Sequence, residues 1–269
     1  MDAKLNAGVL LKTCGVMVLL SACGYAQVHP SSAPQLSFVL EHMRKAQSEA
    51  PTVPYQVTRE YRLFGGNDSS ASSRVIAEVD YSPSEGKSYE IQKESGSKRA
   101  ADVVHKVLQH EVEMGQSKNV GQSAIDPSNY SFDYLGEASL DGNPCYLLGL
   151  NPKRKDTELL HGKAWVDAKS FQIRRIQGQM VKNPSWFLKR VDVTIDFSEV
   201  GGSWLETAVE AVADVRFLGS QTLKSETVDA HVGESLVAKN VRSDEKVSRH
   251  KGRRHSIPAT AIVPMDSPR

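Results

Sequence analysis

VDVTIDFS, residues 191–198, alternates apolar and polar side chains without a break. Successive side chains of a β-strand point to opposite faces of a sheet, so this stretch predicts a strand with one buried and one solvated face. Gly201-Gly202 follows as a turn, and the alternation resumes from Leu205 to Phe217. Because two long strands joined by a tight turn pair antiparallel, this hairpin predicts an antiparallel sheet.

The same pattern of strands and turns continues on both sides of this hairpin. The strongest turn signal is DGNP at 141–144. The predicted strands are residues 55–63, 74–81, 87–94, 130–134, 145–150, 159–167, 171–180, 191–198, 205–217 and 223–228. Many strands joined by tight turns indicate a single curved antiparallel sheet.

Two segments instead carry apolar residues at helical spacing. The first, 36–48, follows a capping box formed by Ser32 and Gln35, and the second, 98–114, follows Ser97 as a predicted N-cap. Two helices can cover one face of the sheet but not both. The predicted fold class is α+β and mostly β: a curved antiparallel sheet that forms an unclosed half-barrel, covered on its concave face by two or more helices.

The first 26 residues have the layout of an export signal. Two lysines precede an apolar run at 16–20 that is too short to span a bilayer, and small residues follow it. Two cleavage sites stay open: one before Cys23, which resembles a lipobox and would leave that cysteine lipidated, and one after Ala26. We therefore expect an exported protein, either in the periplasm or anchored as an outer-membrane lipoprotein.

The rest of the chain divides by composition. A short tether at 27–35 precedes a predicted domain at 36–231, and residues 232–269 are basic with few apolar residues, which predicts a disordered tail. The expected partners of this tail are a membrane or cell-wall polymers, although a solvated extension without function fits equally well. Nucleic acid is not an expected partner of an exported protein with a net charge of +1, and we expect a monomer.

Catalytic constellations are absent from the sequence. It holds no G-x-S-x-G or H-E-x-x-H motif and no phosphate-binding loop. His105 and His110 are five residues apart on the predicted helix, so they diverge and do not face one metal. Asp192 and Asp196 share a strand face that is expected to be solvated, and Cys145 is expected to be a small buried residue. We therefore predict no enzymatic activity, no metal and no cofactor.

Two short patterns resemble the LolA/LolB-like superfamily of periplasmic lipoprotein carriers, also called outer-membrane lipoprotein-sorting proteins. They are a strand that ends in a Pro-basic turn, GLNPK at 149–153, and a hairpin made of GKAWVD at 162–167 and FQIRR at 171–175. The resemblance covers residues 36–231. It implies an unclosed barrel, capped by helices, whose apolar cavity holds the acyl chains of lipids or lipoproteins.

The implied cavity lies between the sheet and the helices. Its expected lining is Leu36, Val39, Leu40, Met43, Val104, Leu108, Trp165, Phe171, Val193, Ile195, Val209 and Ala211. The basic residue that locks the lid in this family stays unassigned among Arg59, Arg62 and Arg74. Two alternatives remain. The helices can complete a solid core, which gives the same burial pattern, or the domain is an envelope sensor or interaction module that binds a lipoprotein or a membrane partner.

Overall fold

The computed structural model describes residues 36–66, 68, 70–116 and 121–233. The export signal with its two cleavage sites, the tether with its capping box, and the basic tail from residue 234 onward lie outside the described residues. All the residues described below belong to a single compact unit of the chain.

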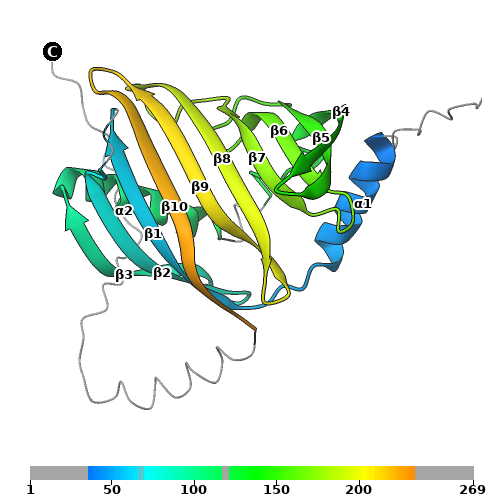
Figure 1. Cartoon of the computed structure of the whole chain (residues 1–269), viewed down its shortest axis with the longest axis horizontal. Helices are drawn as coiled ribbons and strands as arrows, with labels where there is room; N and C mark the ends of the chain where they lie inside the picture. The colour runs from blue at the N-terminus through cyan, green and yellow to red at the C-terminus, as the bar shows by residue number, and fades with distance from the viewer. Residues whose placement is uncertain (1–35, 67, 69, 117–120, 234–269) are drawn as a thin grey trace, which may run out of the picture. The chain divides into compact units, whose positions relative to one another are not determined.

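Two helices and ten strands make up the described part of this unit (Figure 1). In chain order they are α1 (Leu36–Glu49), β1 (Tyr55–Gly65), β2 (Ser73–Ser82), β3 (Gly86–Gly96), α2 (Lys98–Met114), β4 (Tyr130–Leu140), β5 (Asn143–Pro152), β6 (Leu160–Asp167), β7 (Ile173–Met180), β8 (Leu188–Val200), β9 (Ser203–Val215) and β10 (Gly219–Val232). The strands form one sheet in the order β3-β2-β1-β10-β9-β8-β7-β6-β5-β4.

The sheet is antiparallel throughout and open. Its two edges are β3 and β4, and β10 brings the end of the domain back beside β1. The predicted fold class, a mostly β half-barrel with helices on one face, is confirmed. Strand β4 runs six residues beyond its predicted end at Tyr134, because a bulge between Tyr134 and Gly136 breaks the alternation while the pairing with β5 continues.

Helix α2 has the predicted limits, but its predicted cap is corrected. Ser97 stands at the N-cap position with extended backbone angles, and its side chain makes no capping hydrogen bond. Its backbone N–H instead donates to the carbonyl of Ser72, at 2.8 Å. This bond ties the start of α2 to the residue that precedes β2.

Direct cross-strand pairs define one continuous face of the sheet. From β1 to β4, residues opposite one another along one row are Tyr61, Ser225, Val209, Ile195, Ile176, Ala164, Leu148 and Tyr134. Directly paired residues project from the same side of a sheet. We call this side the inner face, because both helices pack on it.

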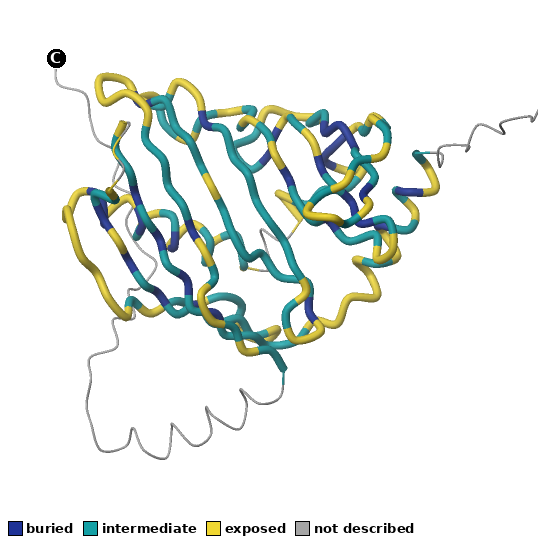
Figure 2. Tube along the Cα trace, in the orientation of Figure 1, coloured by how far each residue is buried: buried dark blue, intermediate teal, exposed yellow. Residues whose placement is uncertain are grey.

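The two helices cover different parts of the inner face. Val39 and Met43 of α1 pack with buried residues of β4 to β7, which we call the α1 cluster. Val104 and Leu108 of α2 pack with buried residues of β1 and β2, the α2 cluster. Burying one such side chain stabilises the fold by about 1.5–3 kcal/mol. Figure 2 shows the buried residues gathered toward the two sides of the sheet, with mostly half-buried residues on the strands between them.

Candidate functional site

A strip of small apolar side chains lies on the inner face between the two clusters. On β9 it consists of Val209, Ala211 and Ala213, all half-buried, and among the described residues these belong to neither cluster. On β8 it continues with Val193 directly opposite Ala211 and Ile195 directly opposite Val209. We call these five residues the inner strip. These small side chains are packed into neither helix cluster and keep part of their apolar surface exposed.

The two sides of the inner strip border the two clusters. Val193 and Ile195 pack against the α1 cluster. On the other side Leu223 of β10 lies directly opposite Ala211 and packs against the α2 cluster. Because both helices stand on this same face, the strip is the floor of the space between them.

A pocket of about 390 Å³ adjoins one end of the inner strip. Its lining includes Phe197, which follows Ile195 on the same face of β8, together with Trp204 and Leu205 of β9. Tyr55 and Tyr81 also line it, and their rings stack with centroids 5.0 Å apart. Its volume lies within the range of ligand pockets, about 300–1,000 Å³, and its lining is more apolar than polar.

The helical residues expected to line a cavity are packed into the clusters. Val39, Met43, Val104 and Leu108 are at most 2% exposed. Leu36 and Leu40 are half-buried against the α1 cluster. These side chains fill the space between each helix and the strands beneath it. They therefore border the inner strip on its two sides and do not line an open cavity of their own.

Trp165 lies on the other side of the sheet. Its neighbours Ala164 and Val166 are buried in the α1 cluster, so alternation directs the indole to the outer face, where Trp165 is paired with Leu147 and Arg175. We therefore leave Trp165 out of the candidate site.

Phe171 fixes α1 to the sheet. Its ring lies 4.6 Å from that of His42 and 5.8 Å from that of Phe38, both on α1, and it stacks on Tyr146 of β5. The turn that presents it holds Phe171 at a φ of 57°, a left-handed conformation that is rare for an aromatic residue.

The carboxylate of Asp167 stabilises this turn. Asp167 is 4% exposed, and its Oδ1 accepts hydrogen bonds from the backbone N–H groups of Lys169 and Ser170. Its Oδ2 accepts a 2.6 Å bond from Arg174 Nε. Burial alone would raise the pKa of Asp167, but the bonds from Ser170, Arg174 and Lys169 outweigh it and hold this pKa below its ordinary value. The charged carboxylate is therefore the form that the fold stabilises.

A buried polar cluster borders the inner strip on the α2 side. Arg59 is 6% exposed, and its guanidinium lies 2.7 Å from Glu206 of β9 and 3.4 Å from Glu111 of α2. The hydroxyl of Tyr61 donates a 3.4 Å bond to Glu111. Burial would lower the pKa of Arg59, but Glu206 and Glu111 raise it above its ordinary value, so the guanidinium stays charged. Burial also raises the pKa of Glu111, which Arg59 offsets only in part.

The sequence contained a signal for this cluster that the prediction did not use. Arg59 stands between Val57 and Tyr61 on the apolar face of its strand. A charged residue on a buried face requires a partner of opposite charge. The partners are 52 and 147 residues away along the chain, which no local pattern reveals.

Two histidines connect α2 to different parts of the domain. His105 Nε2 lies 2.8 Å from Glu94 of β3, and His110 Nε2 lies 3.1 Å from Glu158, which precedes β6. The two side chains diverge, as expected, and His110 is an exposed side chain with a carboxylate partner. Among the described residues no group of three or more His, Cys, Asp or Glu is arranged to hold a metal.

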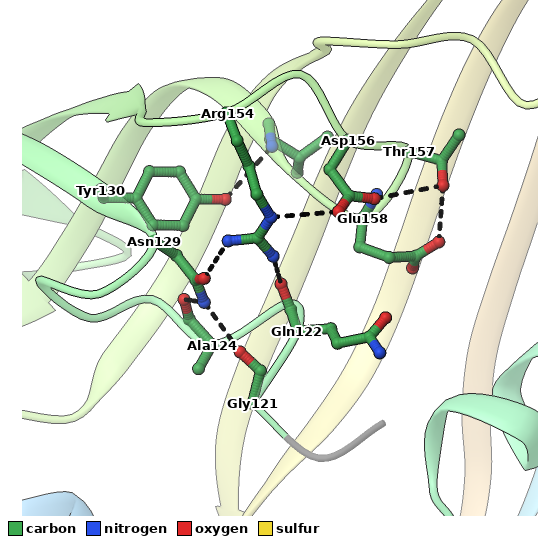
Figure 3. Close-up of polar contacts among 10 residues, drawn as sticks. Gly121, Gln122, Ala124, Asn129, Tyr130, Arg154, Asp156, Thr157 and Glu158 are labelled. Carbon is green, nitrogen blue, oxygen red and sulfur yellow. Dashed lines mark hydrogen bonds and ion pairs between the residues drawn. The ribbon is translucent and has the colours of Figure 1, made fainter. Parts of the chain in front are cut away.

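Residues 121–129, which lead into β4, are anchored by hydrogen bonds to Arg154 and Asn129 (Figure 3). Arg154 donates to the carbonyl of Gln122 at 2.8 Å and to the side chain of Asn129, and it pairs with Asp156 at 3.1 Å. Asn129, which is 4% exposed, donates to the carbonyls of Gly121 and Ala124. Residues 121–129, which precede β4, are therefore held against the β5–β6 loop.

The outer face carries paired charges. Asp192 bonds to Arg190, and Asp196 bonds to Arg175 on the neighbouring strand. The two aspartates thus have separate basic partners, which agrees with the expected solvated face. Lys224 and Glu210 form a further cross-strand pair at 2.7 Å. In the part of the chain that the structure describes, no helix is long and apolar enough to cross a membrane.

Solved structures are similar to this chain at low identity. A protein domain assigned to outer membrane lipoprotein sorting, from Vibrio parahaemolyticus, is 11% identical with a TM-score of 0.43, covering 75% of this chain and 97% of that one. A LolA superfamily protein from Nitrosomonas europaea is 12% identical with a TM-score of 0.38, covering 74% and 93%. A DUF1329 family protein from Desulfovibrio piger is 11% identical with a TM-score of 0.39, covering 72% and 92%.

These similarities concern the fold alone. The LolA superfamily, which the sequence resembles, is represented among them. No protein-family model matches the chain, and no curated protein matches its sequence.

Proposed function

We propose that this protein is an exported carrier that holds the acyl chains of lipids or lipoproteins over the inner strip, and that it is not an enzyme. The observation that carries the proposal is the strip itself. Val209, Ala211 and Ala213 are apolar, half-buried and outside both helix clusters. In a protein of 24% charged residues, an apolar floor between two helices is a surface that a ligand can cover.

The expected strength of binding follows from the length of chain buried. Each acyl CH₂ moved out of water contributes about 0.8 kcal/mol, so even a partly buried chain binds usefully. The adjoining pocket beside Phe197 and Trp204 offers a second apolar surface in continuation of the strip. The acyl chain is proposed to run along β8 and β9, from the pocket across Ile195, Val193 and Ala211.

The test is binding of a fluorescent fatty-acyl probe by the delipidated mature protein, followed by competition with unlabelled palmitate. Saturable binding that palmitate displaces supports the proposal, as does lipid found by mass spectrometry in protein purified without delipidation. If palmitate displaces none of the probe, acyl-chain binding is wrong. A stable protein partner recovered without lipid would favour the interaction module instead.

A further inference from the structure

Two neighbouring turns expose large apolar side chains at one end of the sheet. Trp186 and Phe187, just before β8, are 77% and 44% exposed. Phe217 and Leu218, between β9 and β10, are 95% and 70% exposed. We call these four residues the aromatic tip. In Figure 2 the β9–β10 turn is exposed along its length, so its apolar side chains contribute nothing to either cluster.

The aromatic tip is one structure rather than two separate loops. The backbone N–H of Arg216 donates to the carbonyl of Phe187 at 2.8 Å, and Arg216 Nε donates to the carbonyl of Trp186 at 3.0 Å. The rings of Trp186 and Phe187 meet edge to face, with centroids 6.2 Å apart. The two turns therefore present their side chains in a fixed arrangement.

The backbone of Phe217 has a conformation that other residue types adopt more readily. Its φ is 69°, in the left-handed region where Gly, Asn and Asp are common and a bulky side chain is strained. A phenylalanine that is strained and 95% exposed adds nothing to the packing of this domain.

The charges beside the aromatic tip favour an anionic partner. Four basic residues flank it, namely Lys182, Lys189, Arg190 and Arg216. Lys189 pairs with Asp214 and Arg190 with Asp192, whereas Lys182 and Arg216 have no carboxylate partner in the described part of the chain. Tryptophan and phenylalanine beside cations that have no carboxylate partner form the chemistry that partitions into the headgroup region of an anionic bilayer.

We propose that the aromatic tip docks this protein onto a lipid bilayer that carries anionic headgroups. The aromatic side chains enter the headgroup region, and Lys182 and Arg216 lie against the lipid phosphates. The docking stands independently of acyl-chain binding. If the proposed function also holds, the geometry adds a consequence: Ala211, Ala213 and Val215 follow one another along the inner face of β9 toward the tip, so docking brings that end of the strip to the membrane.

The test measures vesicle binding by the full chain with Cys23→Ser, so that no lipid anchor contributes. Vesicles of phosphatidylethanolamine with phosphatidylglycerol are compared with vesicles of phosphatidylcholine alone, by co-sedimentation. We expect the double variant Trp186→Ser/Phe217→Ser to bind the anionic vesicles roughly tenfold more weakly, because two interfacial aromatics are lost while the basic tail stays in place. The matched control is Val103→Ser/Val228→Ser, two exposed valines on α2 and β10, which should bind as the parent does.

A second readout follows Trp186 itself. Anionic vesicles should shift the tryptophan emission of the parent to the blue, and Trp186→Phe should abolish this shift although Trp165 and Trp204 remain. The proposal is overturned if the double variant binds vesicles as tightly as the parent, or if the emission shift survives in Trp186→Phe. It is also overturned if the parent binds no vesicles and sedimentation shows a dimer that the double variant abolishes, since the tip would then contact a second copy. Acyl-probe binding by the double variant should equal that of the parent, so a failure of docking is distinguishable from a failure of the proposed function.

Discussion

Arg59 on β1 is joined to Glu206 on β9 across the intervening strand β10. One guanidinium nitrogen lies 2.7 Å from the Glu206 carboxylate, and another donates to the Glu206 backbone carbonyl at 3.1 Å. The same guanidinium contacts Glu111 of α2 at 3.4 Å. A single buried cation therefore connects the first strand, the centre of the sheet and a covering helix at the border of the inner strip.

Removing this cation should strongly destabilise the domain. Arg59→Met leaves the half-buried Glu111 and Glu206 near each other without a counter-charge. Loss of one partner from a fully buried pair costs about 3–5 kcal/mol, and the partial exposure of the two carboxylates places the expected cost at the lower end, about 3 kcal/mol. The free energy of unfolding in urea measures this cost. Arg62→Met is the matched control on the same strand: Arg62 pairs with Glu226 on the opposite face and is 32% exposed, so its loss should cost about 0–1 kcal/mol. If the two variants lower the free energy of unfolding by the same amount, the cluster around Arg59 stabilises the domain no more than an exposed ion pair does.

Glu111 should make stability depend on pH in the acid-to-neutral range. Burial raises its pKa, so the folded state binds its proton more tightly than the unfolded state does. Its contribution to stability is full below the unfolded pKa of about 4.3 and is lost as the pH rises through the raised value. Glu111→Gln removes this dependence. Urea unfolding from pH 4 to 7 should show the variant gaining stability relative to the parent as the pH rises, and parallel profiles would contradict the assignment.

Much of the architecture was accessible from the sequence because it depends on local alternation. The run at 191–198 became the centre of β8, and the residues predicted to share a lining there, Val193 and Ile195, are paired directly with Ala211 and Val209. Residues of one strand face stay together whatever the details of the turns, so register carries them to the same site.

The residues that sequence reasoning placed less well depend on contacts between distant segments. Trp165 lies on the outer face because its neighbours Ala164 and Val166 point inward. Which alternate residues of β6 point inward is known only from the burial of these two neighbours. The Arg59 cluster joins three elements that are far apart in the chain. Trp186 has no pattern around it that predicts 77% exposure, because its position is set by hydrogen bonds to a turn 30 residues later.

Asp167 should stabilise the domain at neutral pH and lose this effect in acid. Its pKa lies below the ordinary value, so its contribution is full above the unfolded pKa of about 3.9 and disappears as the pH falls through the depressed value. In Asp167→Asn the side-chain oxygen can still accept from the backbone of the turn, but an NH₂ group replaces the oxygen that accepts from Arg174. Loss of this charged hydrogen bond should lower the free energy of unfolding by about 1.5–3 kcal/mol. Thermal unfolding should show this difference in stability between the parent and Asp167→Asn at pH 7, and a smaller difference near pH 3.

The control for this prediction is Asp192→Asn on the outer face. Asp192 is 42% exposed and bonds to Arg190, so its loss should cost no more than about 1 kcal/mol. If Asp167→Asn loses no more stability than this at neutral pH, the turn that holds Phe171 does not depend on the carboxylate.

Filling the inner strip should block acyl-chain binding without unfolding the domain. Ala211 lies directly between Val193 and Leu223, so the indole of Ala211→Trp would cover the floor between the helices. Excluding two CH₂ groups of ligand removes about 1.6 kcal/mol, so we expect the acyl-probe Kd to rise roughly tenfold or more. Ala208→Trp is the matched control on the same strand, because Ala208 lies opposite Asp196 on the outer face. Its probe affinity should equal that of the parent. If both variants bind the probe as tightly as the parent does and their circular dichroism is unchanged, the acyl chain binds elsewhere. If both variants lose affinity equally, the substitutions disturb β9 and the loss is not due to filling of the strip.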